Sequence, residues 1–280
     1  MLRKAMVIAM LAAGAEAQAG APPSFRMSGV KTVELRHESA ADRREGRIPG
    51  CIVCHIGQAE TLTLDFDVID GATESLYYSY YFAPPYVQSG CNILLIDCRA
   101  HGLSEGKYNY CGTREYADLL CWIRFAHDTL GNRNVILHGI CVGGAAVVLA
   151  ASRPEFPSYV SHIVLEGLFA TFFESFKLHM KAEGKPTFPV LYEIFLVARL
   201  ESGLKVWESA PIRCIDRVKT PLLFLHGTRD TFSLPKRAEE LYAKCTAPKK
   251  LVWMDKGSHS HLRINNTEVY DGAIRDFLTQ

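Results

Sequence analysis

The stretch Val135-Ile136-Leu137-His138-Gly139-Ile140-Cys141-Val142-Gly143-Gly144 decides the fold and the candidate chemistry of this 280-residue chain. An apolar run typical of a buried strand ends in G-x-C-x-G, and small residues typical of a tightly packed helix follow, which is the setting of a nucleophile elbow. Glycines two residues before and after Cys141 let strand and helix cross, and the free amides of the new helix lower the pKa of a thiol there. The alternative interpretation is a buried structural cysteine in a βα turn.

A candidate base and a carboxylate to orient it follow later in the chain. Asp230 ends Gly227-Thr228-Arg229-Asp230, and His259 ends Gly257-Ser258-His259; each segment comes after an apolar, strand-like run. A cysteine nucleophile needs a base, and that base needs a group that fixes its tautomer. The sequence therefore predicts a Cys141, Asp230, His259 triad, with Glu166 as a substitute acid and His261 as a competing base.

Short apolar runs alternate with longer amphipathic stretches along most of the chain. Continuous apolar runs predict strands buried on both faces, as in a parallel sheet, and their alternation with helices predicts one α/β domain over 30–280. The expected strands are 50–54, 92–97, 135–138, 160–165, 222–226 and 250–254, and the expected helices are 113–130, 143–152, 236–244 and 267–278.

One insertion interrupts this alternation. About fifty residues separate Leu165 from Leu222, far more than a single crossover helix needs. Four phenylalanines at positions 169, 172, 173 and 176 have helical spacing, and 190–204 is helical again. We interpret 168–208 as a helical cap that supplies an apolar acyl pocket; the alternative is a pair of ordinary core helices.

Composition narrows the class of partner. Lys plus Arg (31) and Asp plus Glu (30) nearly cancel, so the chain has no electrostatic footprint for nucleic acid, and 48% hydrophobic residues are ample for one core. No apolar run reaches the roughly 18 residues of a membrane span, so no integral membrane span is predicted. A dinucleotide-binding loop would need glycine at position 141, and no cofactor or metal is expected. A small-molecule substrate is the expected partner.

The N-terminus and the cysteines point to different compartments. Met1-Leu2-Arg3-Lys4 is basic, an apolar stretch follows, and alanines at A-x-A spacing end it, which predicts a signal peptide over 1–19 and a secreted or periplasmic protein. The nine cysteines are an odd number, so an exported chain would keep at least one free thiol. A cytoplasmic protein with reduced core cysteines is the alternative.

From about residue 30 onward the chain resembles the α/β-hydrolases, in particular the compact lipase, esterase and peptidase-like branch with a small cap. The order Cys141, Asp230, His259 carries the resemblance. The segment from Asp97 to Gly106 is similar to the family pattern D-x-R-G-H-G-x-S-x-G, and that from Ile56 to Leu62 to H-G-N-x-E-N-L, with isoleucine in place of histidine. The cysteine elbow resembles those of dienelactone hydrolases and polyhydroxyalkanoate synthases.

This resemblance implies a fold and a reaction. The fold is a mostly parallel central sheet with helices on both faces and a small helical cap. The backbone amides of Gln58 and Val142 would form the oxyanion hole. The expected activity is hydrolysis of carboxylic esters, thioesters or lactones through an acyl-cysteine; the alternatives are acyl transfer from the same intermediate and a catalytically inactive fold used for binding.

Cys51-Ile52-Val53-Cys54-His55 has the C-x-x-C-H pattern of c-type haem attachment. The string lies in an apolar, strand-like run, and the rest of the chain is typical of a hydrolase, so we expect no haem. A zinc site would need a second C-x-x-C pair. The purified protein should show no Soret absorbance; a Soret band would establish the haem hypothesis instead.

Overall fold

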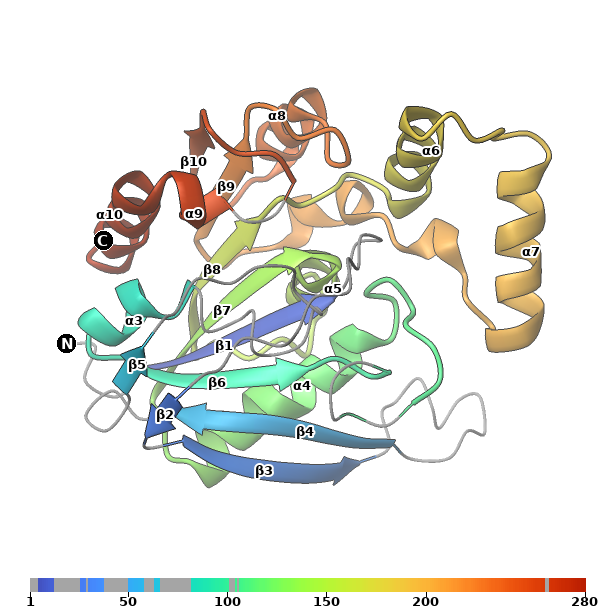
Figure 1. The fold of residues 1–280 in the computed structure, drawn as a ribbon. Helices are drawn as coiled ribbons and strands as arrows, with labels where there is room; N and C mark the ends of the chain where they lie inside the picture. The colour runs from blue at the N-terminus through green and yellow to red at the C-terminus, as the bar shows by residue number, and fades with distance from the viewer. Residues whose placement is uncertain are drawn as a thin grey trace.

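The computed structural model describes residues 5–12, 26–28, 30–37, 50–57, 63–65, 82–100, 104, 106–259 and 262–280. Its centre is an eight-stranded sheet with the order β10-β9-β8-β7-β1-β6-β4-β3 (Figure 1). These strands are β1 (Ala5–Ala12), β3 (Val30–His37), β4 (Gly50–Gly57), β6 (Asn92–Asp97), β7 (Asn134–Cys141), β8 (Val160–Glu166), β9 (Leu222–Gly227) and β10 (Lys249–Met254). Two short strands, β2 (Arg26–Ser28) and β5 (Thr63–Asp65), pair apart from it.

Every pair of neighbours from β6 to β10 is parallel, and only β4 runs against its neighbours β3 and β6. Helices α4 (Glu115–Arg124) and α5 (Val142–Ala151) pack together over one face, and α3 (Pro84–Gln88) and α10 (Thr267–Leu278) over the other (Figure 1). Helix α8 (Pro235–Lys244) lies beside β9, and the short α9 (Leu262–Asn265) precedes α10. The predicted mostly parallel α/β sheet with helices on both faces is confirmed.

The expected helix 113–130 has two parts. Helix α4 ends at Arg124, and a π-helical turn, η2 (Phe125–Thr129), continues it. The expected helix 143–152 is α5, which begins one residue earlier, directly at the elbow. Among the described residues, no helix combines the length and the apolar character that crossing a membrane requires.

Two helices, α6 (Phe172–Ala182) and α7 (Val190–Ser202), connect β8 to β9, followed by the short turns η3 (Val206–Glu208), η4 (Pro211–Arg213) and η5 (Ile215–Arg217). The phenylalanine spacing that suggested one helix from 169 is broken at Thr171, whose hydroxyl caps α6 by accepting from the Glu174 amide at 3.3 Å. Phe169 therefore precedes the helix and is fully buried. Gly203, at φ 77°, ends α7 in the left-handed conformation that glycine adopts without strain.

The segment predicted as a signal peptide overlaps an inner strand. Ala5–Ala12 forms β1, which pairs in parallel with β6 on one side and β7 on the other. Cleavage after residue 19 would remove β1, which lies between β6 and β7 in the sheet. A protein with this eight-stranded sheet and a protein with a cleaved signal peptide are therefore alternatives. The signal peptide and the secreted or periplasmic location stay predictions, which the N-terminal sequence of the isolated protein decides.

The elbow itself depends on glycine because β7 and α5 cross at very close range. A Cβ added at Gly139 would lie 2.7 Å from the backbone nitrogen of Gly144, closer than atoms of two residues can pack. The backbone carbonyl of Gly139 in turn lies 3.1 Å from the Cβ position of Gly144. The strand and the helix on either side of residue 141 are therefore so close that positions 139 and 144 leave little room for a side chain.

We expect Gly139→Ala to lower the free energy of unfolding by about 1–3 kcal/mol, because the added methyl overpacks the crossing. Gly272→Ala is the matched control: Gly272 lies within α10, and its Cβ position has no atom within 4 Å. Alanine should raise the helical propensity there and stabilise the protein by about 0.5–1 kcal/mol. Urea unfolding of both variants measures the difference; equal effects would contradict the close crossing.

Candidate active site

Cys141 lies at the tip of the elbow, as the last residue of β7 and the N-cap of α5. Its φ of 50° and ψ of −111° are unusual for a residue with a side chain, and 2% of the residue is exposed. Such strain persists only where the surrounding structure enforces it, and it concentrates at functional sites. The first amides of α5, including that of Val142, have no partner within the helix and point towards this residue.

His259 and Asp230 meet directly. The imidazole Nδ1 of His259 lies 2.8 Å from Oδ2 of Asp230, so Nδ1 donates to the carboxylate. The backbones of the segments that carry them lie in direct contact, because a Cβ at Gly227 would lie 2.6 Å from the carbonyl oxygens of Gly257 and Ser258. The structure thus brings the predicted acid and base together at the ends of β9 and β10.

The Asp230 carboxylate is fully buried and saturated with hydrogen bonds. Its Oδ1 accepts from the amides of Phe232, at 2.9 Å, and Ser233, at 2.7 Å. His226 donates from Nε2 to the Ser233 carbonyl at 2.6 Å, and burial lowers the pKa of this histidine. The two amides therefore hold the carboxylate in place, and His226 holds the backbone of Ser233 that supplies one of them.

The imidazole of His259 lies between two groups that carry negative charge when ionised. Burial disfavours the imidazolium, but the charge of Cys141 and the hydrogen bond and charge of Asp230 outweigh it, and the pKa of His259 rises well above its usual value. The second ring nitrogen, Nε2, is buried and makes no hydrogen bond to the described residues. Because Nδ1 is engaged by Asp230, Nε2 is the nitrogen available to exchange a proton with Cys141.

Two residues at the site were missed in the sequence. Gly167, at φ 56° directly after β8, lies so close that a Cβ there would contact His259 Cε1 at 3.4 Å and Asp230 Oδ2 at 3.7 Å. The ring of Phe232 covers the imidazole, with centroids 4.7 Å apart. A glycine after a buried strand was a readable signal for the first; nothing in the sequence pattern distinguishes Phe232 from other phenylalanines.

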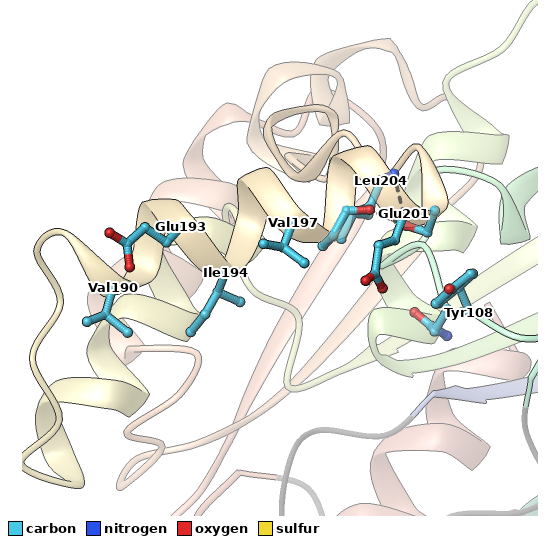
Figure 2. A pocket seen from close by; sticks show the side chains of 10 residues that line it. Tyr108, Val190, Glu193, Ile194, Val197, Glu201 and Leu204 are labelled. Carbon is cyan, nitrogen blue, oxygen red and sulfur yellow. Dashed lines mark hydrogen bonds between the residues drawn. The ribbon is translucent and has the colours of Figure 1, made fainter.

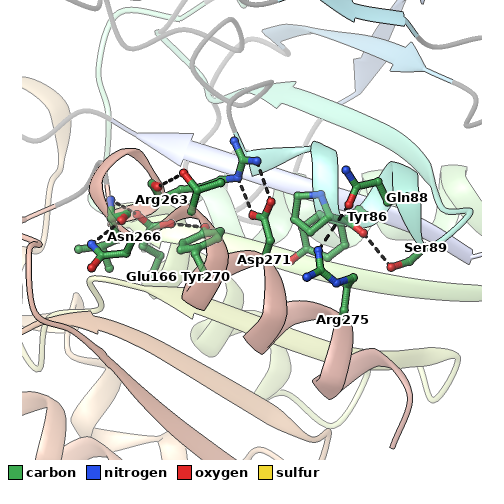
Figure 3. A network of polar contacts seen from close by, with 12 residues as sticks. Tyr86, Gln88, Ser89, Glu166, Arg263, Asn266, Tyr270, Asp271 and Arg275 are labelled. Atoms are coloured by element: carbon green, nitrogen blue, oxygen red, sulfur yellow. Dashed lines mark hydrogen bonds and ion pairs between the residues drawn. The ribbon is translucent and has the colours of Figure 1, made fainter.

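Glu166 does not serve as the acid beside His259. Its carboxylate accepts from the Tyr270 hydroxyl at 2.5 Å and from the Leu262 amide at 3.3 Å, in a buried network beside α10 (Figure 3). His138 belongs to the same network, with its Nδ1 2.8 Å from the Tyr86 hydroxyl. His138 and His226 are thus buried, hydrogen-bonded histidines. Gln58 and His261 lie outside the described residues, so the second oxyanion donor and the competing base stay predictions.

The other thiols of the described residues differ from Cys141 in their surroundings. Seven cysteines are described with their side chains, and six of them, Cys141 included, are buried. Burial raises the pKa of Cys91 to about 12, and burial, Glu115 and Cys141 raise that of Cys111. Burial also raises the pKa of Cys245. No group of three or more potential metal ligands occurs in the described part of the chain.

Apolar surface surrounds the site on the side of α6 and α7. The ring of Phe232 contacts Phe172 of α6, which in turn contacts Phe195 of α7. A cavity of about 490 Å³ lies between α7 and the segment at Tyr108 and Asn109 (Figure 2). Its size is within the range of about 300–1,000 Å³ typical of small-molecule sites.

Comparison with known proteins agrees with this architecture. Residues 68–184 match the model of the alpha/beta hydrolase fold family. The protein YqkD of Bacillus subtilis is 27% identical over 213 residues, 75% of this chain and 70% of that protein. An uncharacterized membrane protein of Saccharomyces cerevisiae is 28% identical over 199 residues, 70% of this chain and 63% of that protein, so the match spans less than two thirds of the yeast relative.

Among solved structures, the esterase Pf2001 of Pyrococcus furiosus superposes with a TM-score of 0.65 at 19% identity, covering 89% of this chain and 92% of that one. An esterase of Exiguobacterium antarcticum superposes with a TM-score of 0.59 at 14% identity, covering 88% and 99%. The sheet order, the elbow and these matches define an α/β-hydrolase fold. The family model itself matches residues 68–184, and a hydrolase-domain relative of Arabidopsis thaliana is 25% identical over 199 residues.

The raised pKa of His259 has a measurable consequence. We expect this histidine to titrate above the value of about 6.5 that an unperturbed histidine has. Because the native pKa is the higher one, the imidazolium stabilises the native state fully below about pH 6.5, and this stabilisation is lost as the pH rises through the native pKa. Asp230→Asn should lower the pKa of His259 by about 1–3 pH units, because it removes the paired charge.

Histidine titration by NMR of the labelled protein measures these values. His162 is the internal control, because burial lowers its pKa and it is far from the candidate triad in the sheet. A native pKa at or below that of an unfolded histidine would contradict the charge arrangement, as would an unchanged pKa in Asp230→Asn.

Proposed function

We propose that this protein is an acyl hydrolase in which Cys141 is the nucleophile, His259 the general base and Asp230 the group that orients the base. One observation carries the proposal: a strained cysteine at a helix N-terminus lies beside an imidazole that is 17% exposed, and one ring nitrogen of that imidazole donates to a buried carboxylate at 2.8 Å. These are the roles and the geometry that nucleophilic acyl transfer needs.

The reaction follows from the charges at the site. The Cys141 thiol passes its proton to Nε2 of His259, and the thiolate attacks the carbonyl carbon of the substrate. The carbonyl electron pair moves to oxygen, where the Val142 amide donates to it; one such donor contributes about 3–4 kcal/mol. The tetrahedral intermediate collapses, His259 returns the proton to the departing alcohol or thiol, and an acyl-cysteine remains. His259 then deprotonates a water, which attacks the acyl carbon and releases the acid and the thiol.

Esters, thioesters and lactones are the proposed substrates. A thiolate is a good nucleophile near neutral pH but also a good leaving group, so the first intermediate favours substrates whose own leaving group departs readily. Amides would return to the starting state more often than they react. The proposal names water as acceptor; an alcohol or amine that enters the same acyl-enzyme would make the protein an acyltransferase.

A binding protein with an inactive site is the second candidate function. The two candidates differ in the behaviour of one thiol. In an active site the pair with His259 keeps Cys141 reactive, whereas the pKa values of Cys91, Cys111 and Cys245 are raised and these thiols react slowly. Iodoacetamide should therefore modify Cys141 before these three, and peptide mass spectrometry of the partially labelled protein distinguishes the candidates.

The catalytic test is turnover of p-nitrophenyl esters and acyl thioesters by wild type and by Cys141→Ala. We expect Cys141→Ala to lower kcat by about 10³-fold or more, because it removes the attacking atom. His259→Gln should have a comparable effect, and intact-mass analysis of the wild type should detect an acyl adduct that Cys141→Ala lacks.

Cys121→Ala is the control, because Cys121 is a partly exposed cysteine on α4, outside the candidate triad. Its turnover should equal that of the wild type. Unchanged turnover in Cys141→Ala would refute the proposed nucleophile, and absence of turnover in the wild type with every ester, thioester and lactone offered would favour the binding protein.

A further inference from the structure

Helix α7 exposes large apolar side chains that a helix of a soluble domain normally buries. We call five of them, on α7 and its two flanking segments, the α7 apolar face. They are Phe188, 79% exposed, Tyr192, 45%, Leu196, 56%, Leu200, 76%, and Trp207, 44%. Among the described residues outside 188–207, only Ile264 and Val269 are large, apolar and exposed. A concentration of this kind marks an interaction surface.

The position and pattern of α7 suit a flat apolar partner. Tyr192, Leu196 and Leu200 recur every fourth position, so they form one stripe along the helix. Phe188 precedes the helix and extends this stripe through its ring contact with Tyr192, with centroids 6.0 Å apart. The helix stands at the edge of the molecule, away from the sheet (Figure 1). A second stripe, with Ile194 and Val197, lines the cavity beside Tyr108 (Figure 2). Apolar side chains therefore occupy both the outward side of α7 and the side that borders the cavity.

Ring contacts connect the α7 apolar face to the candidate base. Successive rings in this series have centroids between 4.7 Å and 6.4 Å apart. In order, they are Phe188, Tyr192, Phe173, Phe195, Phe172, Phe232 and His259. We call the six aromatic residues of this series the aromatic wall. Their contacts form a continuous series from an exposed surface to the imidazole of His259.

We propose that the α7 apolar face docks on a lipid surface and that the acyl chain of the substrate passes from that surface along the aromatic wall to Cys141. The docking stands on the exposed face alone. The substrate class, a carboxylic ester or thioester with a long chain held in a lipid phase, rests on the proposed function.

Area and chemistry favour lipid over a second copy of the chain. A helix of 13 residues is about 20 Å long and about 10 Å wide, so one side of it offers on the order of 200–300 Å². A stable protein interface buries about 800 Å² on each partner. A lipid surface sets no such minimum, because each inserted side chain contributes by its own buried area. Tyr192 and Trp207 are residue types that favour the boundary between lipid and water.

Charge decides which lipid surface fits. Residues 171–208 contain five lysines or arginines and five glutamates, and several of these pair, as Lys205 does with Glu208. Such a neutral segment has no electrostatic attraction to an anionic membrane. The expected partner is therefore a neutral or zwitterionic surface, held by apolar contact and insensitive to salt.

Vesicle flotation tests the docking without reference to catalysis. Wild-type protein should float with phosphatidylcholine vesicles, equally at low and high salt. A variant with Leu196→Glu and Leu200→Glu should bind at least tenfold more weakly. Both side chains are more than half exposed, so the substitutions should leave the fold intact, which circular dichroism and unfolding measurements check.

Val269→Glu is the matched control, because Val269 is 54% exposed, close to the 56% of Leu196, but lies on α10. It should bind vesicles like the wild type. Wild-type protein that stays with the soluble fraction overturns the docking, and so does binding that the double variant keeps. Binding that requires anionic lipid and disappears at high salt, or a dimer in the ultracentrifuge that the double variant dissociates, overturns it as well.

Activity separates this inference from the proposed function. The double variant should hydrolyse a short, water-soluble ester at the wild-type rate but lose at least tenfold on a long-chain ester embedded in vesicles. Equal rates on both substrates in wild type and double variant overturn the lipid route. Absence of hydrolysis of either ester by the wild type, with vesicle binding intact, overturns the proposed function and leaves the docking in place.

Discussion

The close crossing of β7 and α5 is the constraint on which the rest of the structure depends. At Gly139 and Gly144 the backbones of the two elements are in direct contact. This close spacing holds Cys141 in a conformation that a residue with a side chain seldom adopts. The thiol is thereby placed at a helix N-terminus and at the carboxyl end of an inner parallel strand. The next three strands end at the same edge of the sheet, so Gly167, Asp230 and His259 converge on it.

Burial strengthens the interactions between the polar groups at this edge of the sheet. The Asp230 carboxylate is taken out of water but keeps three hydrogen bonds, two from amides and one from His259, which offset the cost of burying it. The thiol and the carboxylate raise the pKa of the imidazole, although burial alone would lower it. Packing fixes the same geometry: Gly227 admits the backbone of Gly257, and the ring of Phe232 covers the imidazole. Helix α6 joins this arrangement through Phe172 and through the ion pair of Glu174 with Arg237 on α8.

Much of the fold could be predicted because its signals are local. The inner strands are continuous apolar runs, and the elbow is a ten-residue pattern of apolar, glycine and small residues. The strand β1 was missed because an apolar segment behind a basic N-terminus has the same composition in a leader and in a buried strand. The start of α6 was placed too early because phenylalanine spacing continues across Thr171, where the capping hydroxyl begins the helix. The first case depended on β6 and β7, which are distant in sequence, whereas the second depended on a local cap three residues long.

The sequence by itself determined the type of the inner elements from β6 to α10 that follow continuous apolar or amphipathic runs, the cysteine at the elbow, and the chain order of the candidate residues Cys141, Asp230 and His259, because these signals are local. Only the tertiary structure decided that Asp230 and not Glu166 holds His259, that Gly167 and Phe232 enclose the pair, and that the pKa of the imidazole is raised. It also decided that the apolar side chains of α7 face outward rather than into the core. The reason is physical: hydrogen bonding, burial and charge coupling depend on distances between residues far apart in the sequence, and folding alone sets those distances.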